Sequence, residues 1–163
     1  MQSGKDIMFL KHPTHKPHLR LASENDCIYL SENLREEDKQ EIKAVTGLPA
    51  LVTLLSGLKF SLVPLVICDE QSKPVAMLGV VPNGLIGSIW MVGTDDLKKI
   101  SLSFLRHSKK VCDVIKGKHQ LLHNYVDSRN KLHINWLKWM GFTIIGKVNY
   151  GIENRKFYEF VKI

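Results

Sequence analysis

The apolar and polar positions of this chain predict a strand followed by two or three helices at its N-terminal end. Residues 18–23 have the short apolar pattern of a strand, and Ser23 to Asp26 offer capping oxygens for a helix after it. Residues 34–45 have a helical period, with a predicted solvent face made of Glu36, Glu37, Asp38, Lys39, Glu41 and Lys43. Gly47 and Pro49 then end this helix and begin the next one.

Three apolar runs come next, at residues 63–68, 74–81 and 85–92. The polar stretch 69–73 separates the first two runs, and the turn residues 82–84 separate the second from the third. Short apolar runs with turn residues between them predict an antiparallel meander.

A long basic helix is predicted after Thr94, where the apolar period changes to that of a helix. Its inward stripe consists of Leu97, Ile100, Phe104, Leu105, Val111, Val114 and Ile115. Gly117 ends it. Residues 98–118 carry much of the net charge of +7, which favours a solvated helix face or, as the alternative, a contact with DNA or with a virion.

The C-terminal part alternates between strand and helix. Residues 120–126 are a predicted strand, 130–140 a helix, and 142–148 with 155–161 a closing strand pair. The expected order is β-α-α-β-β-β-α-β-α-β-β, an α/β (α+β) chain with a mixed sheet and a right-handed crossover.

The composition predicts one globular domain. The chain has 163 residues, 44% hydrophobic and 24% charged, which suits a domain over residues 18–163 with an N-terminal arm over 1–17. We expect no membrane span and no secretory signal, because no run approaches about 20 apolar residues. The three cysteines lack CxxC spacing, and the arm's histidines lack a fourth ligand, so neither disulfides nor a metal site are expected.

The segment Val126-Asp-Ser-Arg-Asn130 and the helix after it, which ends in Gly141-Phe142, carry a family resemblance. Together with the element order they resemble the GNAT superfamily over residues 18–162. This resemblance implies a GNAT, or acyl-CoA N-acyltransferase-like, fold. It also implies that Asn130 corresponds to the asparagine that begins the family's second crossover helix.

Within that superfamily the chain is similar to the internal (core) virion protein A family of short-tailed podophages. The residues that carry this likeness are 35–38, 74–80, 89–94 and 124–142. The likeness implies a bacteriophage protein of the virion interior or the host cytoplasm, with other phage virion proteins as partners.

The family's acyl-CoA enzymes hold the pyrophosphate at the start of the central helix, where peptide N–H groups are free. The resemblance places cofactor-binding positions at Val92, Gly93, Thr94 and Asn130. Thr94 can cap the predicted helix, and Asp95 and Asp96 lie in its first turn, where carboxylates oppose a pyrophosphate. We therefore expect weak binding of acetyl-CoA or none.

The residues for proton transfer also depart from the family pattern. Leu137 occupies the position at which the family often has a tyrosine acid, and residues 85–92 contain no acid or base. His123, Tyr125, Asp127 and His133 are nearby substitutes, but no catalytic residue is assigned. The interpretation is an internal virion protein with a structural or ejection-related role and a degenerate site. The alternative is an active acetyl-CoA-dependent N-acetyltransferase acting on a protein or small-molecule amine.

Overall fold

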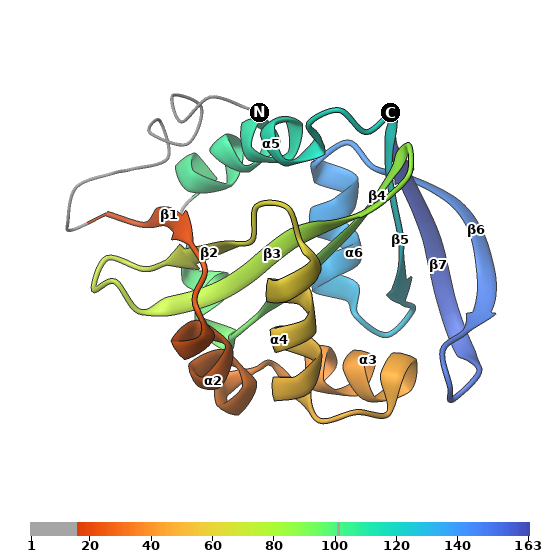
Figure 1. Cartoon of the computed structure of the whole chain (residues 1–163), viewed down its shortest axis with the longest axis horizontal. Helices are drawn as coiled ribbons and strands as arrows, with labels where there is room; N and C mark the ends of the chain where they lie inside the picture. The colour runs from red at the N-terminus through yellow and green to blue at the C-terminus, as the bar shows by residue number, and fades with distance from the viewer. Residues whose placement is uncertain (1–15, 101) are drawn as a thin grey trace.

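A single seven-stranded sheet organises the part of the chain that the computed structural model describes, which is residues 16–100 and 102–163 (Figure 1). The predicted arm and its histidines at positions 12 and 15 lie outside the described residues, except for the arm's last two positions. The strands are β1 (His18–Leu21), β2 (Leu65–Cys68), β3 (Pro74–Asn83), β4 (Ile86–Gly93), β5 (Leu121–Asp127), β6 (Thr143–Tyr150) and β7 (Arg155–Lys162). Their order across the sheet is β1-β2-β3-β4-β5-β7-β6, so the last strand inserts beside β5.

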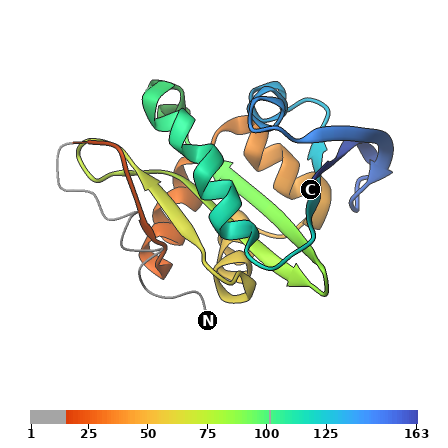
Figure 2. The same cartoon turned by 90° about the horizontal axis from the view of Figure 1, so that it is seen from above.

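Helices cover both faces of this sheet. They are α2 (Glu24–Asn33), α3 (Glu36–Thr46), α4 (Ala50–Phe60), α5 (Leu102–Lys116) and α6 (Lys131–Trp139), with a short 3-10 helix η1 (Asp95–Lys99) before α5. Figures 1 and 2 show α2, α3 and α4 on one face and α5 and α6 on the other. Only β4 and β5 pair in parallel; the other neighbouring strands are antiparallel.

The alternation of side chains along the strands produces two apolar layers. In β2, Leu65 and Ile67 join the cluster that α5 and α6 cover, while Val66 and Cys68 join the cluster under α2 and α4. A strand buried on both faces reads as a continuous apolar run, which is why 63–68 showed no alternation. The three cysteines are buried and unpaired.

The long basic helix predicted after Thr94 is two elements in the structure. The chain first forms η1, and α5 begins only at Leu102. Thr94 therefore precedes the 3-10 helix, and Asp95 and Asp96 lie in its first turn rather than in that of α5. The apolar period alone missed this break because Leu97 and Ile100, which precede it, keep helical spacing with the apolar positions that follow in the sequence.

No helix in the described residues is long and apolar enough by itself to cross a bilayer. Only α3 and α4 counted together would be, and a bend of 77° separates them.

Candidate active site at the fork between β4 and β5

The candidate site lies where the parallel strands β4 and β5 separate (Figure 1). Their ladder joins only residues 86–88 to 121–123. Asn124 makes the next link, because its Nδ2 donates to the carbonyl oxygen of Ile89 at 2.7 Å while its Oδ1 accepts from the Tyr125 N–H at 2.8 Å. Farther along, side chains from α3 and α6 connect the two strands, and we call this opening the fork.

Helix α3 directs two carboxylates into the fork. Asp38 and Glu41 share the helical spacing of Leu34, Ile42 and Val45, so all five lie on the inward face. Asp38 is 3% exposed and Glu41 is half-buried. The prediction that both belong to the solvent face is wrong. Their spacing relative to the apolar stripe was the signal that could have identified them.

Asp38 uses its whole hydrogen-bonding capacity on neighbours. Arg35 donates from Nε to Oδ2 at 3.2 Å and from Nη2 to Oδ1 at 3.0 Å. Gly93 N–H donates to Oδ2 and Asn130 Nδ2 to Oδ1, each at 2.8 Å. A carboxylate accepts about four hydrogen bonds, so Asp38 has no free lone pair. The equally buried Arg35 neutralises its charge.

Glu41 is only half satisfied. Its Oε2 accepts from Asn130 Nδ2 at 2.8 Å, and its Oε1 accepts from the Asp127 N–H at 3.3 Å. Burial raises the pKa of Glu41 to about 8, with the Asp38 charge acting in the same direction and the Asn130 hydrogen bond against it. A glutamate with a pKa near 8 exchanges its proton close to neutral pH, which is the property of a general acid or base.

We call Arg35, Asp38, Glu41 and Asn130 the fork bridge. Asp38 binds the end of β4 through Gly93, Glu41 binds the end of β5 through Asp127, and Asn130 joins the two carboxylates. The bridge thus replaces the backbone ladder that the diverging strands lack.

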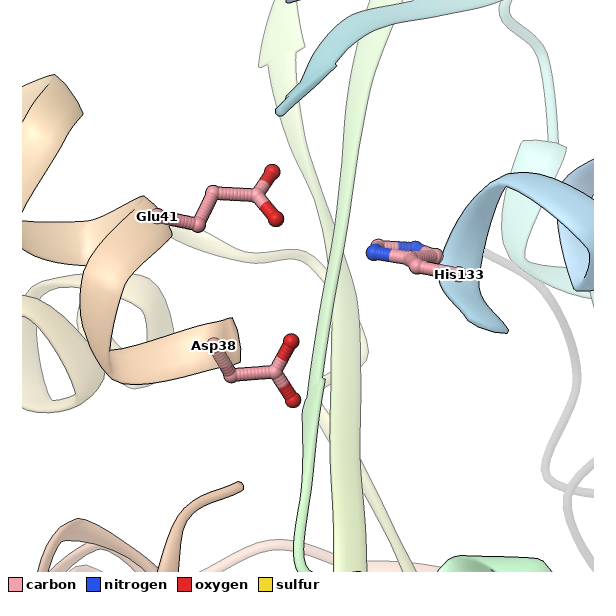
Figure 3. Close-up of side chains that lie close together, drawn as sticks. All are labelled: Asp38, Glu41 and His133. Atoms are coloured by element: carbon pink, nitrogen blue, oxygen red, sulfur yellow. The ribbon is translucent and has the colours of Figure 1, made fainter. Parts of the chain in front are cut away.

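His133 faces this bridge from α6, as Figure 3 shows. Its nitrogen and the carboxylate oxygens of Asp38 and Glu41 lie within 4.8 Å of one another, a spacing open to a metal ion. Burial lowers the pKa of His133 to about 4, which leaves the imidazole neutral at pH 7. A cation would nevertheless have to displace N–H donors from Asp38 and lie beside the Arg35 guanidinium. The cluster is therefore a hydrogen-bonded network rather than a ligand shell.

A cavity of about 210 Å³ lies on the α5 and α6 side of the fork, and we call it the α6-side cavity. Its walls come from β2, β4, η1, α3, α5 and α6, and they include Met91, Val92, Gly93, Leu97, Lys98, Ile100, Ser108, Leu132, His133 and Trp136. The lining is mostly apolar, with the cationic Lys98 as an exposed member.

A second cavity of about 230 Å³ lies on the α4 side, and we call it the α4-side cavity. It is lined by Glu41, Ile42, Val45, Thr46, Thr53, Leu54, Gly57, Trp90, Met91 and Val92, together with Asp38. The two cavities share Asp38, Met91 and Val92 as a common wall. Each exceeds the roughly 10–15 Å³ that a single water needs, so each can admit part of a ligand.

The structure places the four predicted cofactor-binding positions differently. Val92 and Gly93 line the α6-side cavity. Thr94 is buried, and its side chain accepts from the Asp96 N–H at 3.3 Å. Asn130 is fully buried within the fork bridge and lines neither cavity. It occupies the cap position of α6, but its side chain makes no capping hydrogen bond. A cofactor contact at these positions stays a prediction.

The two acidic residues expected at the start of the central helix belong to η1. Asp96 pairs with Lys73 at 2.9 Å and with Lys99 at 3.1 Å, and these two lysines lower its pKa. Asp95 is exposed, and neither aspartate lines the α6-side cavity. The expectation that these carboxylates oppose a bound pyrophosphate stays a prediction, and it now concerns η1 rather than the first turn of α5.

Most of the suggested proton-transfer substitutes are engaged elsewhere. His123 bonds Glu159 at 2.7 Å, Asp127 pairs with Arg129 at 2.7 Å, and Tyr125 stacks on Tyr150. Leu137 is buried in the apolar core. Among the named substitutes only His133 lines either of the two cavities described above, and the residue that sequence reasoning missed is Glu41.

The comparisons with known proteins concern the fold. No protein-family model matches the chain, and no curated protein matches it either. Solved structures do. A ribosomal-protein-S5-alanine acetyltransferase from Vibrio fischeri superposes with a TM-score of 0.63 and 15% identity, covering 94% of this chain and 95% of that one.

Two further acetyltransferase structures resemble this chain to a similar degree. A GNAT-family acetyltransferase from Streptococcus pneumoniae has a TM-score of 0.59 and 17% identity over 90% of this chain and 98% of its own. A spermidine N-acetyltransferase from Vibrio cholerae, in complex with CoA and spermine, has a TM-score of 0.61 and 9% identity over 90% and 95%. The chain therefore has the GNAT acetyltransferase fold, and the predicted fold class is confirmed. The comparisons contain no support for a phage virion protein.

Proposed function

We propose that this chain is an acyl-CoA-dependent N-acyltransferase that takes its acyl donor in the α6-side cavity and an amine in the α4-side cavity. The observation that carries the proposal is Glu41, a half-satisfied carboxyl that lines the α4-side cavity of a GNAT fold. The structural neighbours named above acetylate amines, namely a ribosomal-protein alanine and spermidine, which favours an amine as acceptor.

The residues around the α6-side cavity suit a donor with an amide-bearing arm and phosphates. In β4 the peptide groups on the fork side belong to alternate residues. The Ile89 carbonyl is bound by Asn124, and the peptide groups of Gly93 are bound by Asp38 and Arg35. Met91 lies between them in this alternation, so its peptide groups face the cavity, where they can pair with amides of a donor. Lys98 adds a cation for phosphate.

Acyl-CoA supplies a thioester carbonyl that an amine can attack. In the transfer a C–N bond forms and the C–S bond breaks, so the amine must lose a proton and the thiolate must gain one. Glu41 is the residue we assign to the first proton. Its carboxylate form, populated above its pKa of about 8, accepts a proton from an ammonium group in the α4-side cavity.

Two features of the sequence led us to expect a degenerate site, namely acidic residues that oppose a pyrophosphate and missing residues for proton transfer. The structure bears on both. The two acidic residues before α5 belong to η1, where Asp96 pairs with Lys73 and Lys99. A candidate proton acceptor comes from α3 rather than from β4 or α6. The active-enzyme alternative is therefore favoured over the degenerate one. Residence in a phage particle, contact with other virion proteins and DNA binding through residues 98–118 remain predictions from the sequence.

The test is turnover. Purified protein is incubated with acetyl-CoA and a panel of amines, comprising polyamines, lysine-containing peptides and free α-amino peptides. Released thiol and acceptor mass are then measured. We expect at least one acceptor to be acetylated, Glu41→Gln to lose about 10²–10⁴-fold in rate, and the matched control Glu37→Gln, on the exposed side of α3, to keep full activity. No thiol release with any amine, despite saturable donor binding, would rule the proposal out.

A further inference from the structure

Asn130 uses every polar atom of its side chain inside the fork bridge. Its Nδ2 donates to Asp38 Oδ1 and to Glu41 Oε2, each at 2.8 Å, and its Oδ1 accepts from Arg35 Nη2 at 3.0 Å. The residue is 0% exposed. Both N–H donors of its side chain are thus used within the bridge, and its oxygen is bound to Arg35 and buried, so the side chain offers no donor to a bound ligand.

Arg35 determines which way this amide faces. A guanidinium only donates, so the Asn130 atom beside it must be the oxygen. The two Nδ2 hydrogens must then point to Asp38 and Glu41. Because Arg35 and Asp38 are each 3% exposed and hold one another through two hydrogen bonds, this anchor is fixed by packing as well as by charge.

We infer that Asn130 is a positioning residue, which uses the Arg35–Asp38 ion pair as its anchor to hold the Glu41 carboxyl at the end of β5. The inference rests on the proposed function for the meaning of Glu41, but the hydrogen bonds that carry it do not. It assigns to Asn130 a role other than contact with the acyl donor.

The charged groups that face Glu41 are already paired with other residues, so Asn130 is the neighbour whose substitution should change the pKa of Glu41. On α3 the neighbouring charge is Asp38, already paired with Arg35. On β5 it is Asp127, which pairs with Arg129 at 2.7 Å. From α6 the neutral His133 approaches. The α4 residues of the same cavity are uncharged.

Loss of the Asn130 amide therefore has two consequences for Glu41. The carboxyl loses its 2.8 Å donor and keeps only the 3.3 Å contact to the Asp127 N–H, so its position is less defined. The proton is also held more tightly, because the Asn130 hydrogen bond counteracts the rise in pKa that burial causes.

The experiment compares Asn130→Ala and the isosteric Asn130→Asp with Asn135→Ala, which changes an exposed asparagine of the same helix. The pH dependence of kcat and the KM for acetyl-CoA are measured for each. We expect the acid limb of kcat to move to higher pH in both Asn130 variants, with the rate at pH 7 falling about tenfold for each pH unit of movement. The KM for acetyl-CoA should stay within about twofold, and Asn135→Ala should match the wild type.

Two results would overturn the inference. One is a rise in the KM for acetyl-CoA with an unchanged pH profile, because Asn130 would then bind the donor. The other is a loss of rate in the Asn130 variants that equals their loss of folded protein, with no shift in the pH profile, because Asn130 would then serve stability only.

A measurement that needs neither turnover nor a stable variant separates this inference from the proposed function. The side-chain amide resonances of Asn130 in ¹⁵N-labelled wild-type protein should titrate with a midpoint near 8, the pKa of Glu41, and the titration should vanish in Glu41→Gln. An inactive protein that shows this titration rejects the proposed function and keeps the positioning role. Absence of the titration rejects the positioning role.

Discussion

The ionisation of Glu41 should make the folded state less stable as the solution becomes alkaline. Burial places its pKa at about 8, against 4.5 for an unperturbed glutamate. Between these two values the folded protein keeps a proton that the unfolded chain has already lost. By linkage, this group's contribution to the free energy of unfolding falls as pH rises from about 4.5 to 8, and it is constant outside that window.

The size of the effect follows from the separation of the two pKa values. At about 1.4 kcal/mol per pH unit, it reaches roughly 5 kcal/mol above pH 8, and about 3 kcal/mol if water relaxes around the half-buried side chain. Glu41→Gln has no proton to lose and removes this penalty. The variant should therefore resemble the wild type at pH 5 and become more stable than it by about 3–5 kcal/mol at pH 9.

Urea unfolding at one-unit intervals from pH 5 to 9 measures this difference. The wild type, Glu41→Gln and Glu37→Gln are compared, and every other titrating group cancels in the difference between curves. Glu37→Gln should run parallel to the wild type because its side chain is exposed. A Glu41→Gln curve that also runs parallel to the wild type would refute the reasoning, since Glu41 would then ionise as it does in the unfolded chain.

Three further changes test other parts of the structure. Asp38→Ala leaves the buried guanidinium without its partner and should lower the free energy of unfolding by about 3–5 kcal/mol, whereas Asp113→Ala, 71% exposed, should cost less than about 1 kcal/mol in the same urea assay. Gly151→Ala would place a Cβ against the carbonyl oxygen of Ala44 in α3 at a φ of +76°, so it should lower the melting temperature more than Gly84→Ala, which has a φ of +60° and open space. Lys98→Ala should raise the KM for acetyl-CoA several-fold with kcat unchanged, as steady-state kinetics would show.

The order of elements and the fold class were predictable from the sequence because each strand and helix has its own apolar period and turn residues. The break between η1 and α5 was not, since Leu97 and Ile100, which precede it, keep the same helical spacing in the sequence as the apolar positions of α5. The insertion of β7 between β5 and β6 depends on long-range pairing, which a local pattern does not encode.

The candidate site was predicted in part. Val92 and Gly93 line a cavity and Asn130 is fully buried and lines neither cavity, while cofactor binding at these positions stays a prediction. Glu41 and Asp38 were taken for solvent-facing residues because most charged helix positions are exposed. What buries them is a partner 92 residues away in the case of Asp38 and 89 away in the case of Glu41, and no spacing rule within α3 reveals that partner.

The pH dependence of acetyl transfer, measured with the best acceptor from the amine panel, tests most directly whether Glu41 takes the proton. A wild-type rate that climbs through pH 8 and levels off above it, together with a Glu41→Gln rate that is low and lacks this rise, is the predicted result. A Glu41→Gln enzyme with the rate and the pH profile of the wild type would contradict it.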